Sequence, residues 1–394
     1  MKIAQRIGRI SPSATMAMKI KADELKAQGK NVLSFAVGEP DFPTPDNVIE
    51  AACRAMRAGD TKYTAASGTT QLKQAICDAT ARDIGVRYQP ANVIISNGAK
   101  HSLLNIFQAL VDAGDEVIII APYWVTYPDQ IRYSEGEPVV VETSGDNGFQ
   151  PDLDQVRDAV TPRTVAIVMN SPCNPTGAVY DRETIEGMAQ IAVEKDVALI
   201  SDEIYKHIIF DGAEHISPAS TSDEARAQTL IVDGVAKTYA MTGWRIGWFI
   251  GDEAVVRAAG RFQGQATSNP NSIAQAATIE ALTGPQESVE QMRAEFERRR
   301  DFVVERLAEV PGVRCVRPVG AFYAFPNVSE HYGRNLGGSL VDNSDAMCEY
   351  LLATGLISCV SGSSFGADDH IRLSFACSME QLDGGLSRLK QALA

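Results

Sequence analysis

Two ionisable side chains follow directly on apolar, strand-like runs. Asp202 comes after the run Val197 to Ser201, and Lys237 comes shortly after the run Thr229 to Asp233. In open α/β sheets, ligands bind at the carboxyl ends of the strands. A lysine there can form a Schiff base with an aldehyde when burial and neighbouring groups lower its pKa, whereas a buried carboxylate is costly unless it is paired. The two positions therefore predict a site that combines an amine nucleophile with a carboxylate suited to a cationic partner.

The chain also contains a predicted helix start that is suited to bind an anion. After the apolar run Val93 to Ser96, Gly98-Ala99-Lys100 opens a stretch whose apolar residues have helical spacing and which ends at Gly114. The first N–H groups of such a helix favour a phosphate or a carboxylate. A glycine in this kind of turn can equally serve packing alone, so the segment indicates an anion site only together with other features.

These residues need a sheet to hold them, and the sequence predicts one of about seven strands. Short Val- and Ile-rich runs recur from residue 90 onward and alternate with amphipathic helical stretches. Such an alternation is typical of an α/β fold with a mostly parallel sheet covered on both faces. The predicted strands are Val93 to Ser96, Glu116 to Ala121, Pro138 to Glu142, Thr164 to Met169, Val197 to Ser201, Thr229 to Asp233 and Ile246 to Ile250.

Past Gly284-Pro285 the pattern changes, which predicts a second, smaller α+β domain. Its first element is a long charged helix with the run Arg298-Arg299-Arg300, which we interpret as a solvated helix face. The residues before Pro45 are too few to fold alone, so we expect them to pack on this domain or on a partner chain. The predicted large domain is 45–285, and the small one is 1–44 with 286–394. Its predicted helices are Ser288 to Glu309, Ser344 to Ala353 and Met379 to Ala394, and its strands are Val313 to Arg317, Ala321 to Phe325, Ile357 to Val360 and Ile371 to Ser374.

Composition narrows the class of partner. The 36 Lys and Arg against 50 Asp and Glu give a net charge of −14, so a binder of nucleic-acid phosphates is not expected. No apolar run approaches the ~20 residues that cross a bilayer, and we expect neither a membrane span nor a secretory signal. Seven dispersed cysteines without a C-x-x-C pair fit reduced thiols in a cytoplasmic protein, without a zinc site.

Four segments together resemble the class I aminotransferases of the type I pyridoxal-phosphate fold, in particular the bacterial I-beta subgroup with its aspartate aminotransferases. The resemblance covers essentially the whole chain, and it implies a large domain with a mostly parallel seven-stranded sheet and a smaller α+β domain. The segments are Gly38-Glu39-Pro40-Asp41-Phe42, Asn170-Ser171-Pro172-Cys173-Asn174-Pro175-Thr176-Gly177, Ser201-Asp202-Glu203-Ile204-Tyr205, and the run from Ala236-Lys237-Thr238 to Gly243-Trp244-Arg245-Ile246-Gly247.

The resemblance implies roles for the residues around the cofactor ring. Lys237 would form the Schiff base with pyridoxal 5'-phosphate and, once freed, catalyse the 1,3-proton shift. Asp202 would pair with the protonated pyridine nitrogen, and Tyr205 and Asn174 would donate to the phenolic oxygen. Trp124 would stack on the ring face, and Asn174 and Trp124 would also border the substrate.

The cofactor phosphate has its own implied partners. Arg245 would bind it through a charge-assisted hydrogen bond, together with the backbone of Ala99 and Lys100. Many family members add a serine hydroxyl three residues before the Schiff-base lysine, but this chain has Gly234 there. Tyr63 matches the tyrosine that reaches the phosphate of the neighbouring subunit, so the resemblance implies a homodimer with active sites at the interface.

The resemblance also assigns the substrate pocket. Arg372 would bind the α-carboxylate, because a guanidinium matches a carboxylate with two hydrogen bonds, and Gly38 would complete that pocket through its backbone. Ser361 stands where proline is usual at the start of the nearby loop. Lys100 and Thr15 match the residues that contact the distal carboxylate of dicarboxylic substrates in the aspartate aminotransferase subgroup, some of whose members also accept prephenate.

We therefore expect an aminotransferase that moves the amino group of L-aspartate or L-glutamate to a 2-oxo acid such as 2-oxoglutarate, by a ping-pong route through pyridoxamine phosphate. The alternatives on the same scaffold are transamination of alanine, aromatic amino acids or kynurenine, and carbon–sulfur β-elimination. A pyridoxal-dependent transcription regulator would carry a basic extension ahead of Gly38, and a dehydrogenase would carry an early G-x-G-x-x-G. We expect neither.

Taken one at a time, the same residues have plainer interpretations. Lys237 alone would be a surface charge, Asp202 a helix N-cap and Trp124 a core residue. Tyr63 would be a surface aromatic, and Lys100 would be the exposed end of a helix. The assignment of a site therefore depends on the residues meeting in one place.

Overall fold

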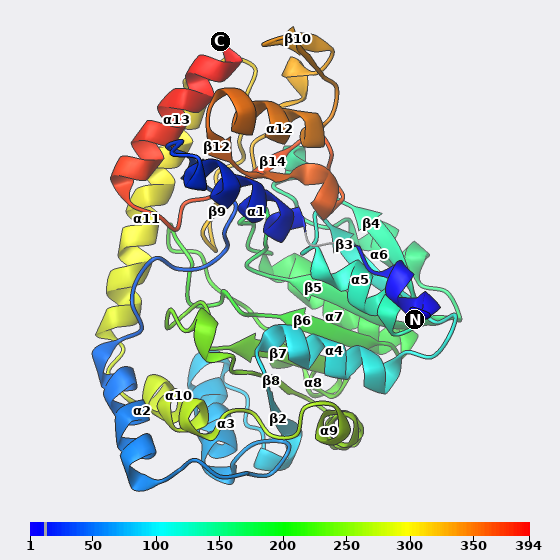
Figure 1. The fold of residues 1–394 in the computed structure, drawn as a ribbon. Coiled ribbons are helices and arrows are strands. Elements are labelled where there is room, and N and C mark those ends of the chain that lie inside the picture. Colours follow the sequence, from blue (N-terminus) through cyan, green and yellow to red (C-terminus); the bar gives the residue numbers. More distant parts are fainter. Residues whose placement is uncertain (12–13) are drawn as a thin grey trace.

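The computed structural model describes residues 1–11 and 14–394, and a seven-stranded sheet forms its centre (Figure 1). The strand order is β2-β8-β7-β6-β5-β3-β4. Strand β8 runs antiparallel to both neighbours, whereas β7, β6, β5, β3 and β4 pair in parallel, which confirms the predicted sheet. The strands are β2 (Val93–Ser96), β3 (Glu116–Ala121), β4 (Glu137–Glu142), β5 (Thr164–Asn170), β6 (Ala198–Asp202), β7 (Thr229–Gly234) and β8 (Gly247–Ile250).

Helices cover both faces of the sheet. Successive side chains of a strand point to opposite faces, so each strand packs on helices at both faces. Ile119 and Val168 pack toward α4 and α9, whereas Ile118 and Ile167 pack toward α7. Helix α10 contacts α2 and α3, and the three helices cover the β2 end of the sheet. The helices are α2 (Asp46–Ala58), α3 (Thr70–Ile84), α4 (Ala99–Leu110), α5 (Thr126–Tyr133), α6 (Leu153–Ala159), α7 (Arg182–Lys195), α8 (Asp223–Gln228), α9 (Glu253–Ala266) and α10 (Ser272–Thr283).

The C-terminal part packs around a three-stranded antiparallel sheet, and the N-terminal segment packs with it. Strand β1 pairs in parallel with β12, and α1 contacts β12 and β13, so the blue α1 lies among the orange and red elements in Figure 1. The elements are α1 (Ala14–Ala27), β1 (Leu33–Ser34), α11 (Glu287–Ala308), β9 (Tyr323–Ala324), β10 (Arg334–Leu336), β11 (Ser339–Val341), α12 (Ser344–Thr354), β12 (Ile357–Ser358), β13 (Val360–Ser361), β14 (Ile371–Ser374) and α13 (Met379–Leu393).

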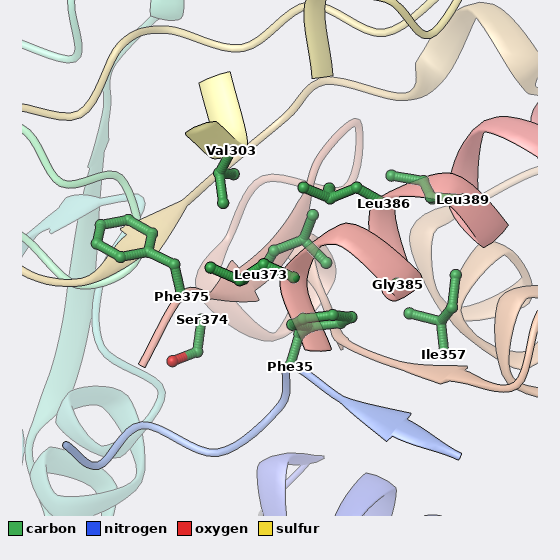
Figure 2. Close-up of a pocket in the computed structure, with 10 residues that line it drawn as sticks. Phe35, Val303, Ile357, Leu373, Ser374, Phe375, Gly385, Leu386 and Leu389 are labelled. Atoms are coloured by element: carbon green, nitrogen blue, oxygen red, sulfur yellow. The ribbon is translucent and has the colours of Figure 1, made fainter. Parts of the chain in front are cut away.

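Phe35 anchors the N-terminal segment in this part of the core. Figure 2 shows its ring among Ile357 of β12, Leu373 of β14 and Gly385 of α13. The ring fits because residue 385 has no side chain: a Cβ there would lie 2.2 Å from Cζ of Phe35. The space left between these side chains is only about 10 Å³, so the N-terminal segment completes a close-packed core.

One predicted strand is absent. The segment Val313 to Arg317 is irregular, and its only described ladder contact is a single bridge from Arg314 to Asn327. Val313 and Val316 still pack on the core, which accounts for the apolar pattern that suggested a strand. Side-chain burial alone does not make a strand, because a strand also needs a neighbour for its backbone groups.

The interpretation of the arginine run as a solvated face is wrong for two of its three residues. Arg299 is buried and pairs with Asp41 at 2.7 Å, and Arg300 is fully buried and pairs with Asp211 at 2.8 Å. A buried guanidinium is tolerated because carboxylates from distant segments balance it. Ion pairs therefore connect helix α11 to the segment around Asp41 and to the segment around Asp211.

A membrane span, a metal site or a disulfide would each require particular features of the described residues. No helix among residues 1–11 and 14–394 combines enough length and apolar character to cross a membrane. The same residues contain no group of three or more His, Cys, Asp or Glu side chains suited to hold a metal ion. All seven cysteines are free thiols.

Candidate active site

A cavity of about 480 Å³ lies at the carboxyl ends of β5 and β6 and beside the first turn of α4. Residues of β9 and β14 and the backbone near Gly38 form its opposite wall. The cavity therefore lies between the large sheet and the C-terminal part. It brings together the predicted residues Gly38, Ala99, Lys100, Trp124, Asn174, Asp202, Tyr205, Lys237, Arg245 and Arg372.

The predicted residue Tyr63 is not among those that line the cavity. Tyr63 is 92% exposed and lies in the segment between α2 and α3. Thr15 belongs to the first turn of α1, but its side chain is outside the part of the chain that the structure describes. The next residue, Met16, does line the cavity, so α1 reaches the cavity wall.

Lys237 lies in the turn after β7 and directs its amine into the cavity. Its Nζ donates to the carbonyl oxygen of Gly38 at 2.6 Å. Burial, together with the positive charge of Arg372, lowers the pKa of the Lys237 amine to about 8. A substantial fraction of the amine is therefore neutral near pH 7 to 8, as a nucleophile or proton acceptor requires.

Asp202 ends β6 and is buried at the floor of the cavity. One carboxylate oxygen accepts the Tyr127 hydroxyl at 2.7 Å, and the other accepts the Ile204 N–H at 3.3 Å. Both donors are neutral, and burial raises the pKa of this carboxyl to about 6. Such a carboxylate favours a cation that enters the cavity.

The first turn of α4 and Arg245 together form a positively polarised end of the cavity. Gly98, with φ of 87°, turns the chain so that α4 begins at Ala99. The guanidinium of Arg245 lies directly against this turn, since a Cβ on Gly98 would be 2.6 Å from its Nη2. Its Nη1 donates to the Thr242 carbonyl at 2.8 Å. Helix N–H groups and a guanidinium that converge in this way suit a phosphate.

The absence of a side chain at Gly234 has a structural reason. Residue 234 lies where β7 pairs with β8, opposite Gly247. A Cβ on Gly234 would be 3.0 Å from Cα of Gly247 and 3.0 Å from the Ile246 carbonyl oxygen. A serine at residue 234 would therefore require the paired backbone to give way by a few tenths of an ångström.

Arg372 is the buried cation of the opposite wall. Its Nη1 donates to Oδ1 of Asn174 at 3.0 Å and its Nη2 to the carbonyl oxygen of Ala36 at 2.6 Å. Its Nε has no hydrogen-bond partner among the described residues. Because a buried donor without an acceptor is costly, the guanidinium is suited to an incoming carboxylate.

Tyr323 is a cavity residue that the sequence reasoning missed. Its hydroxyl lies 2.9 Å from the hydroxyl of Tyr205, and its ring centroid lies 4.5 Å from Cζ of Arg372. A Cβ on Gly38 would be 2.4 Å from the same hydroxyl. The tyrosine sits in the apolar run 321–325, so it has the sequence signature of a core strand. Only its hydroxyl could have indicated a polar partner.

Lys100 and Trp124 meet at the rim of the cavity. The Lys100 amine lies 5.0 Å from the centroid of the Trp124 ring, within the range of a cation–π contact. Burial, with a smaller contribution from Arg245, lowers the pKa of the Lys100 amine. Lys100 is nevertheless an exposed residue at the start of α4, as the plainer interpretation expects, and it also lines the cavity.

Hydroxyl groups hold the loop that begins at Ser361, the position where the resemblance led us to expect proline. The Ser361 hydroxyl lies 3.2 Å from that of Ser364 and 3.1 Å from that of Ser363. Ser363 also donates to Asp345 of α12 at 3.0 Å. The loop reaches the large sheet through the Tyr123 N–H, which donates to the Phe365 carbonyl at 3.0 Å. These bonds connect the loop to α12 and to the segment after β3.

The donor set fits the cofactor that the sequence implies. Asp202 offers a buried carboxylate with only neutral donors around it, which suits a protonated ring nitrogen. The first turn of α4 and Arg245 suit a phosphate, and a largely buried lysine of lowered pKa suits an aldehyde. A phosphorylated pyridine aldehyde is thus compatible with the residues present.

Comparison with known proteins gives matches over the full chain. A family model described as aminotransferase class I and II matches residues 30–389. The chain is 46% identical over 389 residues to an aspartate aminotransferase of Geobacillus stearothermophilus, with 99% of this chain and 98% of the relative covered. It is 43% identical over 394 residues to an aspartate/prephenate aminotransferase of Thermus thermophilus, with 99% and 98% covered.

Solved structures give the same result for the fold. An aspartate aminotransferase of Thermus thermophilus, solved with maleate, superposes with a TM-score of 0.94 at 43% identity and covers 100% of both chains. An aspartate aminotransferase of Rhizobium meliloti gives a TM-score of 0.97 at 38% identity, with 100% of this chain and 99% of the other covered.

Proposed function

The chain belongs to the class I and II aminotransferase family, and on that premise we propose that it transfers the amino group of L-aspartate or L-glutamate to a 2-oxo acid such as 2-oxoglutarate. The observation that carries the proposal is the cavity that joins Lys237, Asp202 and Arg372. Full-length relatives named aspartate aminotransferase support the donor. Prephenate is the acceptor to test beside 2-oxoglutarate, because several relatives are named for it.

We propose pyridoxal 5'-phosphate as the cofactor. Asp202 would hold the ring nitrogen, Tyr205 and Asn174 the phenolic oxygen, and Trp124 one ring face. The first turn of α4, at Ala99 and Lys100, and Arg245 would hold the phosphate. When bound, this group supplies an aldehyde that condenses with amines and a ring that accepts electron density from the amino-acid Cα.

Lys237 is proposed as the residue that moves the proton. Its pKa of about 8 leaves part of the amine neutral, so Nζ can accept the proton from the substrate Cα and later return one. The Gly38 carbonyl oxygen, 2.6 Å from Nζ, accepts its hydrogen bond and holds the amine in position when no proton is being transferred. The residues of this turn thus supply general acid–base catalysis.

Arg372 is proposed to orient the amino acid. Its guanidinium is already held by Asn174 and Ala36, and its Nε lacks an acceptor among the described residues. An α-carboxylate bound there would be fixed on the wall that faces Lys237. Pre-organisation of this kind lowers the entropy cost of bringing the Cα to the base.

Lys100 and Thr15 are proposed to bind the distal carboxylate of dicarboxylic substrates. Lys100 is an exposed cation that lines the cavity, and it stands in the first turn of α4 beside Trp124. The Thermus thermophilus neighbour solved with maleate is an example of this family with a dicarboxylate. A chain of net charge −14 that retains a cation here is consistent with an acidic substrate.

We propose a homodimer in which Tyr63 reaches the phosphate of the partner's site. Tyr63 is 92% exposed, and Ile49 and Met56 of the preceding helix are exposed as well. The N-terminal Ile3 and Ile7 add further exposed apolar side chains. A partner chain that covered these positions would remove the apolar side chains from water.

The decisive test is the visible spectrum of the purified protein through one half-reaction. L-aspartate, L-glutamate, L-alanine and L-phenylalanine are added separately, without any oxo acid. We expect a yellow band that the dicarboxylic amino acids bleach fastest. If alanine or phenylalanine bleaches it as fast, the cofactor proposal stands and the acidic-substrate proposal fails. A protein that stays colourless with added pyridoxal phosphate would refute both.

The variant K100M separates recognition of the distal carboxylate from the chemistry. It removes the cation and keeps an apolar stem against Trp124, so bleaching by aspartate should slow at least tenfold, the scale of one lost charge-assisted hydrogen bond. Bleaching by alanine is the matched control and should change little. Equal slowing of both would assign Lys100 to the cofactor alone.

A further inference from the structure

A cluster of buried ions lies beside the active site without lining its cavity. The Lys206 amine is 3.1 Å from a carboxylate oxygen of Asp83 and 2.9 Å from one of Asp233. These three side chains are at most 10% exposed. His207 approaches the same Asp83 oxygen at 3.1 Å. The adjoining space is about 10 Å³, the lower limit for one water, so protein groups must balance these charges.

The cluster joins three segments, two of which carry proposed catalytic residues. Lys206 follows Tyr205 directly in the turn after β6. Asp233 lies near the end of β7, the strand that leads to Lys237, and accepts the Gly234 N–H at 2.7 Å. Asp83 lies in the last turn of α3. One ammonium group therefore links the Tyr205 turn, the end of β7 and a covering helix.

Stability alone gives little reason for this arrangement. A buried ion pair often contributes no more to stability than apolar side chains of the same volume, and the neighbouring Ile76, Trp248 and Leu282 would accept such side chains. What an ammonium between two carboxylates does provide is a fixed geometry, because both ion pairs form only in one arrangement of the three segments. That geometry sets the backbone to which the Tyr205 side chain is attached.

We propose that Lys206 is a positioning residue for Tyr205. Its ion pairs with Asp83 and Asp233 fix the turn after β6 and thereby the place of the Tyr205 hydroxyl, which Tyr323 contacts from the other side at 2.9 Å. The inference rests on the proposed function, in which that hydroxyl donates to the cofactor's phenolic oxygen. Lys206 itself touches neither substrate nor cofactor.

A double-mutant cycle on the full chain loaded with pyridoxal phosphate tests this inference. The variants are K206M, Y205F and the double variant, and the readout is the pH midpoint of the visible absorbance change. Y205F should raise the midpoint, because a hydrogen bond to the phenolic oxygen is lost. K206M should raise it by roughly half a pH unit, and the double variant no further than Y205F alone.

R300M is the matched control. Arg300 is also a buried cation between carboxylates, but it lies outside the cavity. R300M should lower the melting temperature without moving the pH midpoint of the absorbance change. If K206M proves too unstable, D83N removes one of the two partner charges and should raise the midpoint by less.

Three results are decisive against the proposal. Additive shifts in the double variant, or a K206M protein that melts earlier with an unchanged midpoint, would make Lys206 a structural residue only. If Y205F itself leaves the midpoint unchanged, the proposed role of Tyr205 fails first, and the positioning role fails with it.

Discussion

At the residue scale, Asp202 is a carboxylate whose surroundings favour its neutral form. Burial raises its pKa from the ordinary 3.8 to about 6. Between these two pH values the unfolded chain has released a proton that the folded protein retains. The carboxyl's contribution to the unfolding free energy is therefore fully present below pH 4 and is lost as the pH rises to 6. Above pH 6 the loss is about 3 kcal/mol, at 1.36 kcal/mol per pKa unit.

The variant D202N should remove this loss. In the protein without cofactor, its unfolding free energy relative to the parent should increase between pH 4 and pH 6 and stay level above. Urea denaturation at pH 4, 5, 6 and 7 measures this difference in unfolding free energy. Its change with pH is the test, because Asn also alters the hydrogen bond with the Ile204 N–H and so shifts the difference at every pH. Added pyridoxal phosphate should stabilise the parent more than D202N, because only the partner of the ring nitrogen is lost. A flat difference across this range would show that Asp202 does not titrate as the structure implies.

Lys237 gives a second prediction at this scale, and it concerns the rate of cofactor loading. Only the neutral amine attacks an aldehyde, and burial with Arg372 lowers the pKa of Lys237 to about 8. The rate at which added pyridoxal phosphate develops its visible band should therefore rise up to about pH 8 and level off above. K237A, which lacks the amine, is the control. A midpoint near the ordinary lysine value would mean that the amine is solvated before the cofactor binds.

At the element scale, the strands of the large sheet were predictable because each contains a continuous apolar run, and all except the edge strand β4 are largely buried. Val93–Ser96 and Glu116–Ala121 match their predicted bounds for that reason. The segment 313–317 has a similar apolar pattern but no partner strand. Pairing is a property of two segments, so one run of residues does not reveal it.

The candidate site shows the same limit. Lys237, Asp202 and Arg245 stand in segments that resemble a known family, and the cavity contains all three. Tyr323 resembles a core residue in sequence, and Arg300 resembles a surface residue, because their partners Tyr205 and Asp211 are far away along the chain. Spacing along the sequence carries no information about such contacts.

Helix α13 provides a prediction that separates helix propensity from packing. Gly384 and Gly385 are adjacent in the helix interior, where alanine is ordinarily better than glycine by about 0.5–1 kcal/mol. At residue 385 a Cβ would lie 2.2 Å from Phe35, so G385A should destabilise the protein by about 1–3 kcal/mol through overpacking.

G384A is its matched control. Its Cβ would be 3.2 Å from the flexible end of Leu33, so this variant should be neutral or slightly stabilised. Chemical denaturation of both variants decides the matter. Equal stabilities would mean that Phe35 moves aside at little cost.

At the scale of the whole molecule, we propose the division into 45–285 and 1–44 with 286–394, with the cavity between the two parts. Two chains should share each site if Tyr63 serves the partner's phosphate. Co-expression of K237A with Y63F then yields mixed dimers in which one site combines an intact lysine with an intact tyrosine. Activity per site should exceed that expected from the two parents measured separately. No gain would show that a single chain completes its own site.

The pairing of β1 with β12 has a consequence for how the protein is made. Leu33 meets Ile357 in that pairing, and Phe35 meets Leu373 and Gly385 nearby. A ribosome adds about 5–20 residues per second, so tens of seconds pass between the synthesis of the two strands. During that time Val32, Phe35 and Ala36 have no partner surface to bury against. The large sheet can form while translation continues, but the first segment of the chain must wait for nearly the last, and a chaperone that recognises exposed apolar residues has that interval in which to bind it.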